Sequence, residues 1–91
     1  WPPFRNRRTR DLLLEVVTTE ETLYSGEADV VIAPGVEGQL GILPRHAPLL
    51  TAVTKGEVIV RNEGIETSID VNGGFLEVKD NKVTILVTSI L

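Results

Sequence analysis

The chain has 91 residues, 42% of them hydrophobic, and a formal net charge of −4. This length suits one domain with a modest core, and the apolar content argues against disorder. The chain has no cysteine and one histidine, which excludes disulfides, thiolate metal sites and histidine-rich zinc sites, and we expect neither a metal nor a cofactor.

Charge is unevenly distributed along the chain. The first ten residues hold four arginines and no acid, whereas residues 11–91 hold five basic and thirteen acidic residues. We predict a flexible basic N-terminal arm over 1–11, either a solvated tail or a contact for an acidic partner, and one domain over 12–91. The acidic body argues against nucleic-acid binding. We expect no membrane insertion, because no run of about 18 apolar residues occurs, and we see no export signal.

In two early segments, apolar residues occupy both odd-numbered and even-numbered positions. These are residues 12–18 (LLLEVVT) and residues 28–33 (ADVVIA). A strand that is apolar on both faces is typical of a central strand. We therefore predict two strands here that are covered on both sides.

Later segments alternate between apolar and polar residues with a period of two. The segment 57–62 places Val58 and Val60 together, 65–71 alternates throughout its length, and 82–88 is similar. Residues that tolerate positive φ separate these segments about every 8–10 positions, which favours an all-β sandwich or barrel. The turn signals are Lys55-Gly56, Asn62-Glu63-Gly64, Asn72-Gly73-Gly74 and Asp80-Asn81, of which the last predicts a short hairpin.

The middle of the chain is rich in glycine and proline. Gly35, Gly38 and Gly41 have the spacing of neither a dinucleotide-binding nor a phosphate-binding loop. We expect Pro34-Gly35 to turn the chain and Gly38 to turn it back, while the prolines keep the stretch from becoming an ordinary sheet edge. The prediction is a rigid loop over 35–48 at one end of the sandwich, shaped either as a docking surface or only for the fold.

The single histidine, His46, lies between Pro44 and Pro48. A catalytic histidine needs a nucleophile within reach, and no serine lies in a Gly-x-Ser-x-Gly turn, so a small hydrolase is a remote reading. The carboxylates are scattered and suit a solvated surface. We expect His46 to hold its loop by bonding a backbone carbonyl, or to lie in an interface.

Four motifs together resemble the epsilon subunit of F-type ATP synthases. They are YSG at 24–26, EGQLGILPRHAPLLTA at 37–52, NGGFLEV at 72–78 and VTILV at 83–87. The resemblance extends over residues 12–87 and is to the N-terminal domain of that subunit. It implies an all-β fold, a flattened antiparallel β-sandwich of about ten strands.

The resemblance also implies a function. It is that of a non-catalytic central-stalk subunit, which binds the gamma subunit and the c-ring and helps couple proton translocation to ATP synthesis. Such a subunit lies peripherally on the cytoplasmic face of the bacterial inner membrane, or on the matrix or stroma side in an organelle. ATP binding in the family belongs to a following helical domain, so we expect none here.

The family's two interfaces are carried over to positions of this chain as expectations. The c-ring-facing loop would comprise Gly35, Glu37, Gly38, Gln39 and Gly41. The gamma-facing surface would comprise Thr18, His46, Ala47, Pro48 and Thr51. The alternative is an unrelated small β-sandwich module whose loop binds a protein or a glycan.

Overall fold

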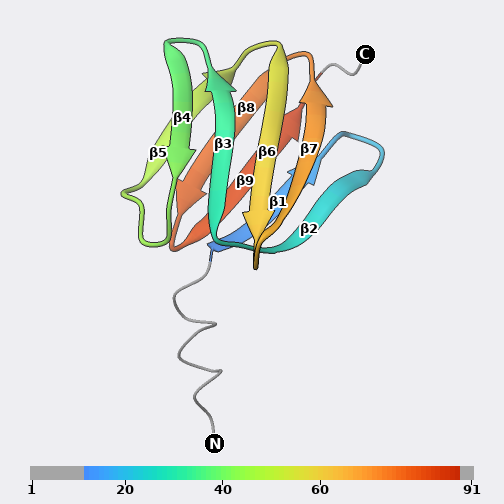
Figure 1. Cartoon of the computed structure of the whole chain (residues 1–91). Coiled ribbons are helices and arrows are strands. Elements are labelled where there is room, and N and C mark those ends of the chain that lie inside the picture. The colour runs from blue at the N-terminus through green and yellow to red at the C-terminus, as the bar shows by residue number, and fades with distance from the viewer. Residues whose placement is uncertain (1–11, 89–91) are drawn as a thin grey trace, which may run out of the picture.

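The computed structural model describes residues 12–88 and is built of strands alone (Figure 1). The predicted all-β fold is confirmed. The predicted arm, residues 1–11, and residues 89–91 lie outside the described residues. The nine strands are β1 (Leu12–Val17), β2 (Thr22–Ala28), β3 (Val30–Gly35), β4 (Gly38–Ile42), β5 (Leu49–Val53), β6 (Gly56–Asn62), β7 (Ile65–Val71), β8 (Gly74–Lys79) and β9 (Lys82–Val87).

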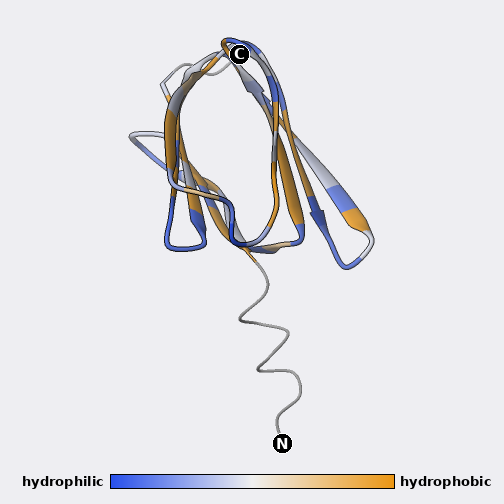
Figure 2. Ribbon diagram, turned by 90° about the vertical axis from the view of Figure 1, so that its left-hand side faces the viewer, coloured by the Kyte–Doolittle hydropathy of each residue, from blue (hydrophilic) through white to orange (hydrophobic). Residues whose placement is uncertain are grey.

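The strands form one sheet that folds over into two layers (Figures 1 and 2). Strands β2, β1, β9, β8 and β5 form the five-strand layer, and β4, β3, β6 and β7 form the four-strand layer. The layers join where Gly35 of β3 pairs with Val53 of β5. Neighbouring strands are antiparallel except β1 and β9, which run parallel. The first and the last strand therefore lie side by side in the five-strand layer, and the two ends of the described chain lie at opposite ends of this strand pair.

The alternating segments behave as predicted. The segment 65–71 is β7, and 57–62 and 82–88 match β6 and β9 to within one residue. The predicted hairpin at Asp80-Asn81 is also confirmed, since φ is 52° and 63° at these two residues. Two successive positive φ values define the type I′ turn, which suits the twist of a tight hairpin.

The prediction of strands covered on both sides is wrong for 12–18 and 28–33. Leu13 lies on the outer side of β1 and is 51% exposed. The second segment is divided at Asp29, with Ala28 ending β2 and Val30 beginning β3. The reason is architectural: a two-layer domain of this length has no third layer, so every strand keeps an outer side.

The prediction of one loop over 35–48 is also wrong. Residues 38–42 form β4, an edge strand paired with β3, and the turn is at Val36-Glu37 because Pro34 and Gly35 still belong to β3. No proline lies inside 38–42, so nothing prevents a ladder there. The segment is therefore half of a hairpin followed by a loop at the opposite end of β4 (Figure 1).

The core lies between the two layers and is aliphatic throughout the described residues. Inward side chains alternate with outward ones along each strand, as the burial pattern of β8 illustrates. Branched aliphatic side chains fill this space without a buried aromatic ring. The buried residues are Leu12, Leu14, Val16, Ala28, Val31, Ala33, Ile42, Val53, Val58, Val60, Val71, Leu76, Val78, Val83, Ile85 and Val87.

Candidate interaction surfaces

The hairpin of β3 and β4 presents the predicted c-ring-facing residues. Glu37, Gly38 and Gln39 are exposed at its tip, and Gly35 is buried at the end of β3. Two anchors hold the hairpin to the end of β5. The Val36 amide donates to the Ala52 carbonyl at 3.3 Å, and the Thr54 amide donates to the Pro34 carbonyl at 2.8 Å. The tip is thus a fixed projection, and not a free loop.

The three glycines of this hairpin differ in what the fold requires of them. Gly38 has φ of 129°, which favours glycine, and a Cβ on Gly35 would lie 2.8 Å from the Gly38 carbonyl oxygen. Both are therefore needed for the turn. Gly41 has no positive φ, and a Cβ built there meets nothing within 4 Å. Neither the backbone conformation nor the packing of residues 12–88 therefore requires a glycine at position 41.

The loop between β4 and β5 carries the central part of the predicted gamma-facing surface. Arg45 has φ of 69°, and its amide donates to Asn81 Oδ1 at 2.8 Å. The loop is thus clamped to the β8–β9 turn. Asn81 was recognised in the sequence only as a turn residue, and nothing in the local pattern indicates its contact with a loop 36 positions away.

The imidazole of His46 bonds the backbone, as predicted. Its Nδ1 lies 2.7 Å from the Ala47 carbonyl oxygen. A carbonyl oxygen only accepts, so Nδ1 carries the proton, and a neutral ring then has Nε2 as an acceptor. Among residues 12–88, this is the one hydrogen bond that the ring makes.

The structure separates Thr18 from the rest of the predicted gamma-facing set. Thr18 follows β1, and its Oγ1 accepts from the amides of Glu20 and Glu21 at 3.1 and 3.0 Å. The other end of β1 lies beside the clamped loop, because the Leu13 amide donates to the Asn81 carbonyl at 3.2 Å. Five strand residues therefore separate Thr18 from that loop, about 17 Å.

The remaining three predicted gamma-facing residues divide between loop and strand. Ala47 and Pro48 are exposed in the loop next to His46. Thr51 lies on β5 between two outward-facing residues, so its half-buried side chain turns toward the inside of the sandwich. The structure thus brings His46, Ala47 and Pro48 together and places Thr51 just beyond them.

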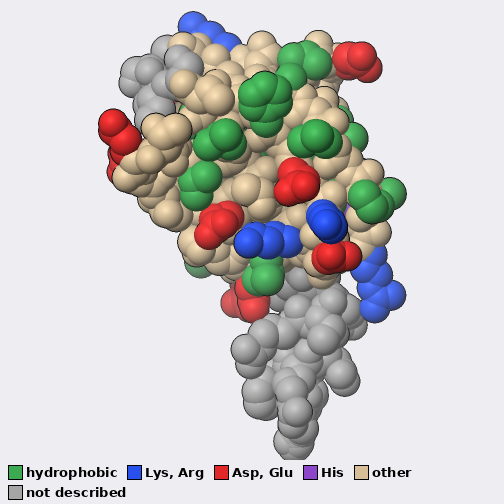
Figure 3. Space-filling model, turned by 180° about the vertical axis from the view of Figure 1, so that it is seen from behind, with side chains coloured by type: hydrophobic (Ala, Val, Ile, Leu, Met, Phe, Trp, Pro, Cys, Tyr) green, Lys and Arg blue, Asp and Glu red, His purple; other side chains and the backbone are tan. Residues whose placement is uncertain are grey.

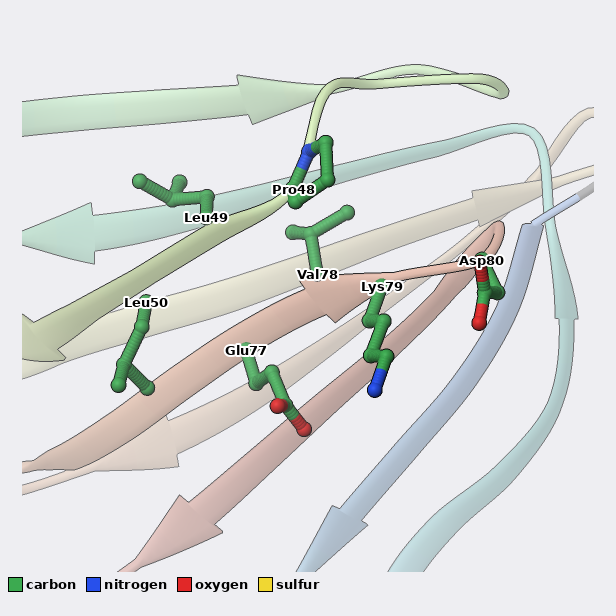
Figure 4. Close-up of a pocket in the computed structure, with 7 residues that line it drawn as sticks. All are labelled: Pro48, Leu49, Leu50, Glu77, Val78, Lys79 and Asp80. Carbon is green, nitrogen blue, oxygen red and sulfur yellow. The ribbon is translucent and has the colours of Figure 1, made fainter.

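A shallow hollow connects this loop to the outer face of the five-strand layer (Figure 4), the face that is turned to the viewer in Figure 3. Its volume is about 410 Å³, and Leu50, Glu77 and Lys79 point to the same side of it. A second hollow of about 420 Å³ lies on the other side of β8 and shares Glu77, Lys79 and Asp80. Neither is enclosed, which suits a surface contact better than a small molecule.

Residues 12–88 contain neither a cluster of metal-ligating side chains nor a helix that could cross a membrane. No group of three or more histidine, cysteine or acidic side chains there is arranged to hold a metal ion. The described part of the chain also has no helix long and apolar enough to cross a membrane.

Comparison with known proteins identifies relatives of the chain. Residues 11–91 match the family model described as "ATP synthase, Delta/Epsilon chain, beta-sandwich domain". The ATP synthase epsilon chain of Dehalococcoides mccartyi is 49% identical over 78 residues, which are 86% of this chain and 56% of that protein. The ATP synthase epsilon chain of Herpetosiphon aurantiacus is 51% identical over 73 residues, 80% of this chain and 54% of that protein. The chain thus spans a little over half the length of these relatives.

Solved structures support the fold. A chain in the mitochondrial ATP synthase of Euglena gracilis (OSCP/F1/c-ring) superposes with a TM-score of 0.83 and 21% identity, over 90% of this chain and 53% of that one. A chain in the central stalk and c-ring of the Tetrahymena thermophila enzyme gives a TM-score of 0.70 and 20% identity, over 86% and 63%. At these identities the likeness concerns the fold alone.

The sequence relatives determine the family. Their identity and coverage, with the family model, confirm the resemblance seen in the four motifs and exclude an unrelated β-sandwich module. The chain therefore belongs to the ATP synthase delta/epsilon chain family, and residues 12–88 form its β-sandwich domain.

Proposed function

We propose that this domain is a non-catalytic part of the central stalk of an F-type ATP synthase. It docks on the gamma subunit and on the c-ring, and so helps couple proton translocation to ATP synthesis at the cytoplasmic face of the bacterial membrane or its organelle equivalent. The observation that carries the proposal is the 49% identity to an ATP synthase epsilon chain over 86% of the chain.

Two features of the domain suit two separate partners. The polar tip around Glu37 and the clamped loop around His46 lie at opposite ends of β4, so one domain can contact two proteins at once (Figure 1). Apart from Val36, the exposed residues of the tip are hydrophilic, which fits contact with the polar loops of a ring. The loop is held before binding by Asn81, which lowers the entropy cost of association.

The proposal is tested first by calorimetry with the cognate gamma subunit. We expect saturable one-to-one binding, and a well-folded domain that does not bind gamma overturns the gamma contact. The contact with the c-ring is then tested by pull-down. The parent domain and a variant with an altered hairpin tip are each used to capture a purified complex of gamma and the c-ring.

Gly41→Ala is the sharpest variant for the ring contact. Because position 41 has ordinary backbone and open space, alanine should leave the free energy of unfolding unchanged or raise it by up to about 0.5 kcal/mol. If the ring approaches the outer side of β4 closely, the added methyl group should weaken docking of the domain by about tenfold.

The matched control is Gly26→Ala on β2. That glycine has no positive φ either, and a Cβ there would make ordinary contacts with Tyr24 at 3.7 Å or more. We expect this variant to dock like the parent chain. By contrast, Gly38→Val distorts the turn itself and so changes folding and docking together. If Gly41→Ala and Gly26→Ala dock with equal affinity, Gly41 does not belong to the ring-facing surface.

A further inference from the structure

Strand β7 is an open edge of the four-strand layer (Figure 1). It lies at the end of the strand order and pairs with β6 alone, so one side of its backbone has no neighbouring strand among the described residues. No backbone hydrogen bond outside the ladders reaches residues 65–71 from the rest of the described chain. Such an edge offers a row of amide and carbonyl groups to which a further strand can bond.

β7 lacks the features that usually prevent pairing at an edge. It has seven residues, contains neither proline nor lysine, and keeps one unbroken register with β6. Among the described strands, the other two with a free side differ. The register of β2 against β1 shifts between Val16 and Val17, and β4 is shorter and begins with positive φ at Gly38. β7 is therefore the edge best suited to receive a strand.

The inner side of β7 is uncovered along the first half of the strand. Ile69 and Thr67 pair with Val58 and Val60, which are buried, so these two residues and Ile65 are on the side that faces the inside of the sandwich. Even so, Ile65 is 70% exposed and Thr67 is exposed as well. The five-strand layer therefore does not cover this part of β7. An aliphatic side chain of an added strand would pack beside Ile65 as a cross-strand neighbour.

The outer side of β7 carries more acid than base. Register places Asp70 directly opposite Glu57, and within residues 12–88 neither carboxylate forms an ion pair. Like charges that lie opposite each other in a sheet are unfavourable. Glu66 is on the same side of β7 and already has a counter-charge, because its Oε1 lies 2.9 Å from Arg61 Nη2. A cation on the free side of Asp70 would offset the repulsion between Asp70 and Glu57.

These features define the chemistry of the occupant. It is an extended segment in which aliphatic residues, on the side of Ile65, alternate with lysine or arginine, on the side of Asp70. A second copy is the poorer fit, because its β7 brings the same two acids and no base. The basic segment of this chain, WPPFRNRRTR, has no alternating aliphatic residues. The better occupant is a segment of a different protein.

We propose that β7 docks such a strand, basic on one side and aliphatic on the other, from another protein, and that the four-strand layer thereby gains one strand. Main-chain hydrogen bonds along the free side of β7 supply the affinity, and the neighbours of Ile65 and Asp70 determine register and specificity. This interaction goes beyond the stalk role and does not depend on it, because it uses neither the hairpin tip nor the His46 loop.

The test is an NMR titration of the 91-residue chain, labelled with nitrogen-15, with the synthetic peptide TKVKVKT. We expect the amide signals of residues 65–71 to shift and their hydrogen exchange to slow, because the peptide pairs with β7. TEVEVET keeps the aliphatic positions and reverses the charge, so its affinity at low salt should be at least about tenfold lower. TKVPVKT should not bind, because its proline cannot continue a ladder.

Two variants with matched controls test the side chains of β7. Asp70→Lys should bind TKVKVKT about tenfold more weakly and should gain affinity for TEVEVET. Glu77→Lys, the same charge change on β8 of the other layer, should behave like the parent chain. Ile65→Gln should weaken binding of TKVKVKT by about threefold, as the loss of a cross-strand pair does. Leu50→Gln on β5, where the side chain is 74% exposed, should not weaken it. Circular dichroism verifies that each variant remains folded.

Each outcome supports or overturns the proposal. If TKVKVKT shifts no signal of residues 65–71, the edge does not accept a strand and the proposal is overturned. Equal affinities for TKVKVKT and TEVEVET overturn the basic character of the occupant. If sedimentation shows dimers of the parent chain in which exchange of residues 65–71 is already slow, the occupant is a second copy and the proposal is overturned. Binding of gamma, measured separately by calorimetry, decides the stalk role, so the two proposals can fail independently.

Discussion

The outer faces of the two layers differ, although their inner faces are alike. Both layers turn aliphatic side chains toward the core, valine and isoleucine among them. Outside, the five-strand layer pairs Phe75 with Leu86, whereas the four-strand layer pairs Arg61 with Glu66, whose Nη2 and Oε1 atoms lie 2.9 Å apart. The inner faces thus specify a generic sandwich, and only the outer faces distinguish one side of the domain from the other.

The difference suggests where selection for something other than folding has acted. On the outside of a sheet, polar residues keep a domain from associating, and an apolar row there is a liability unless a partner covers it. The four-strand layer has such polar residues on the outside of β6 and β7, where Glu57 opposite Asp70 is a further polar pair. The five-strand layer departs from this pattern.

The largest expected effect separates the inner and outer sides of a single strand. Leu76 is fully buried and Phe75, its neighbour on β8, is 53% exposed. Leu76→Ala should lower the free energy of unfolding by about 3 kcal/mol, because a cavity remains where the side chain was. Phe75→Ala should lower it by no more than about 1 kcal/mol, since little buried area is lost. Urea denaturation measures both.

A reversed order would break the contrast between the faces. If Phe75→Ala proved as costly as Leu76→Ala, the outer aromatic ring would be part of the folding unit, and its exposure would no longer point to a partner. Comparable slopes of the urea transitions in both variants are needed, so that the midpoints report stability and not a changed unfolded state.

A smaller effect is expected where the loop is clamped to the five-strand layer. Asn81→Ala removes the acceptor of the Arg45 amide and puts a residue that disfavours φ of 63° into the hairpin turn. We expect a loss of about 1–2 kcal/mol in the free energy of unfolding.

Asn81→Gly divides this loss between its two causes. Glycine accepts the positive φ at no steric cost but supplies no side-chain oxygen, so it keeps the turn and releases the loop. Hydrogen exchange of residues 43–48 should accelerate in both variants, and equal protection in Asn81→Gly and the parent chain would show that the loop is held by other contacts.

The sequence predicts those parts of the fold that depend on neighbours along the chain. The alternation in 65–71 gives β7 with its bounds, because side-chain period and strand length are local properties. Asp80-Asn81 gives its hairpin for the same reason: the turn requires positive φ, and these residues tolerate it. The four motifs likewise identify the family without knowledge of the fold.

The parts that sequence could not supply depend on contacts between distant segments. The parallel pairing of β1 with β9 joins the first and the last strand of the described domain. The Arg45 amide reaches Asn81, and the Glu63 amide donates to Asp29 Oδ2 at 2.9 Å across 34 positions. The sequence did not indicate β4, because this strand begins with a glycine, which has a low strand propensity. The strand forms nonetheless, because it pairs with β3. Of the candidate site, the sequence predicted the bond of His46 to a backbone carbonyl, whereas the apolar face gave no contiguous signal.

The smallest effect is expected on the polar outer face of the four-strand layer. Glu66→Gln removes the ion pair with Arg61, but the two side chains are 53% and 50% exposed. Surface pairs of this kind contribute about 0.5 kcal/mol or less, and salt screens them. We expect urea midpoints of the variant and the parent chain to differ slightly at low salt and to coincide at high salt. A loss well above 1 kcal/mol that persists in high salt would mean that this face, too, is structurally constrained, and the contrast with the apolar row would then reflect packing in both layers and not a partner on one of them.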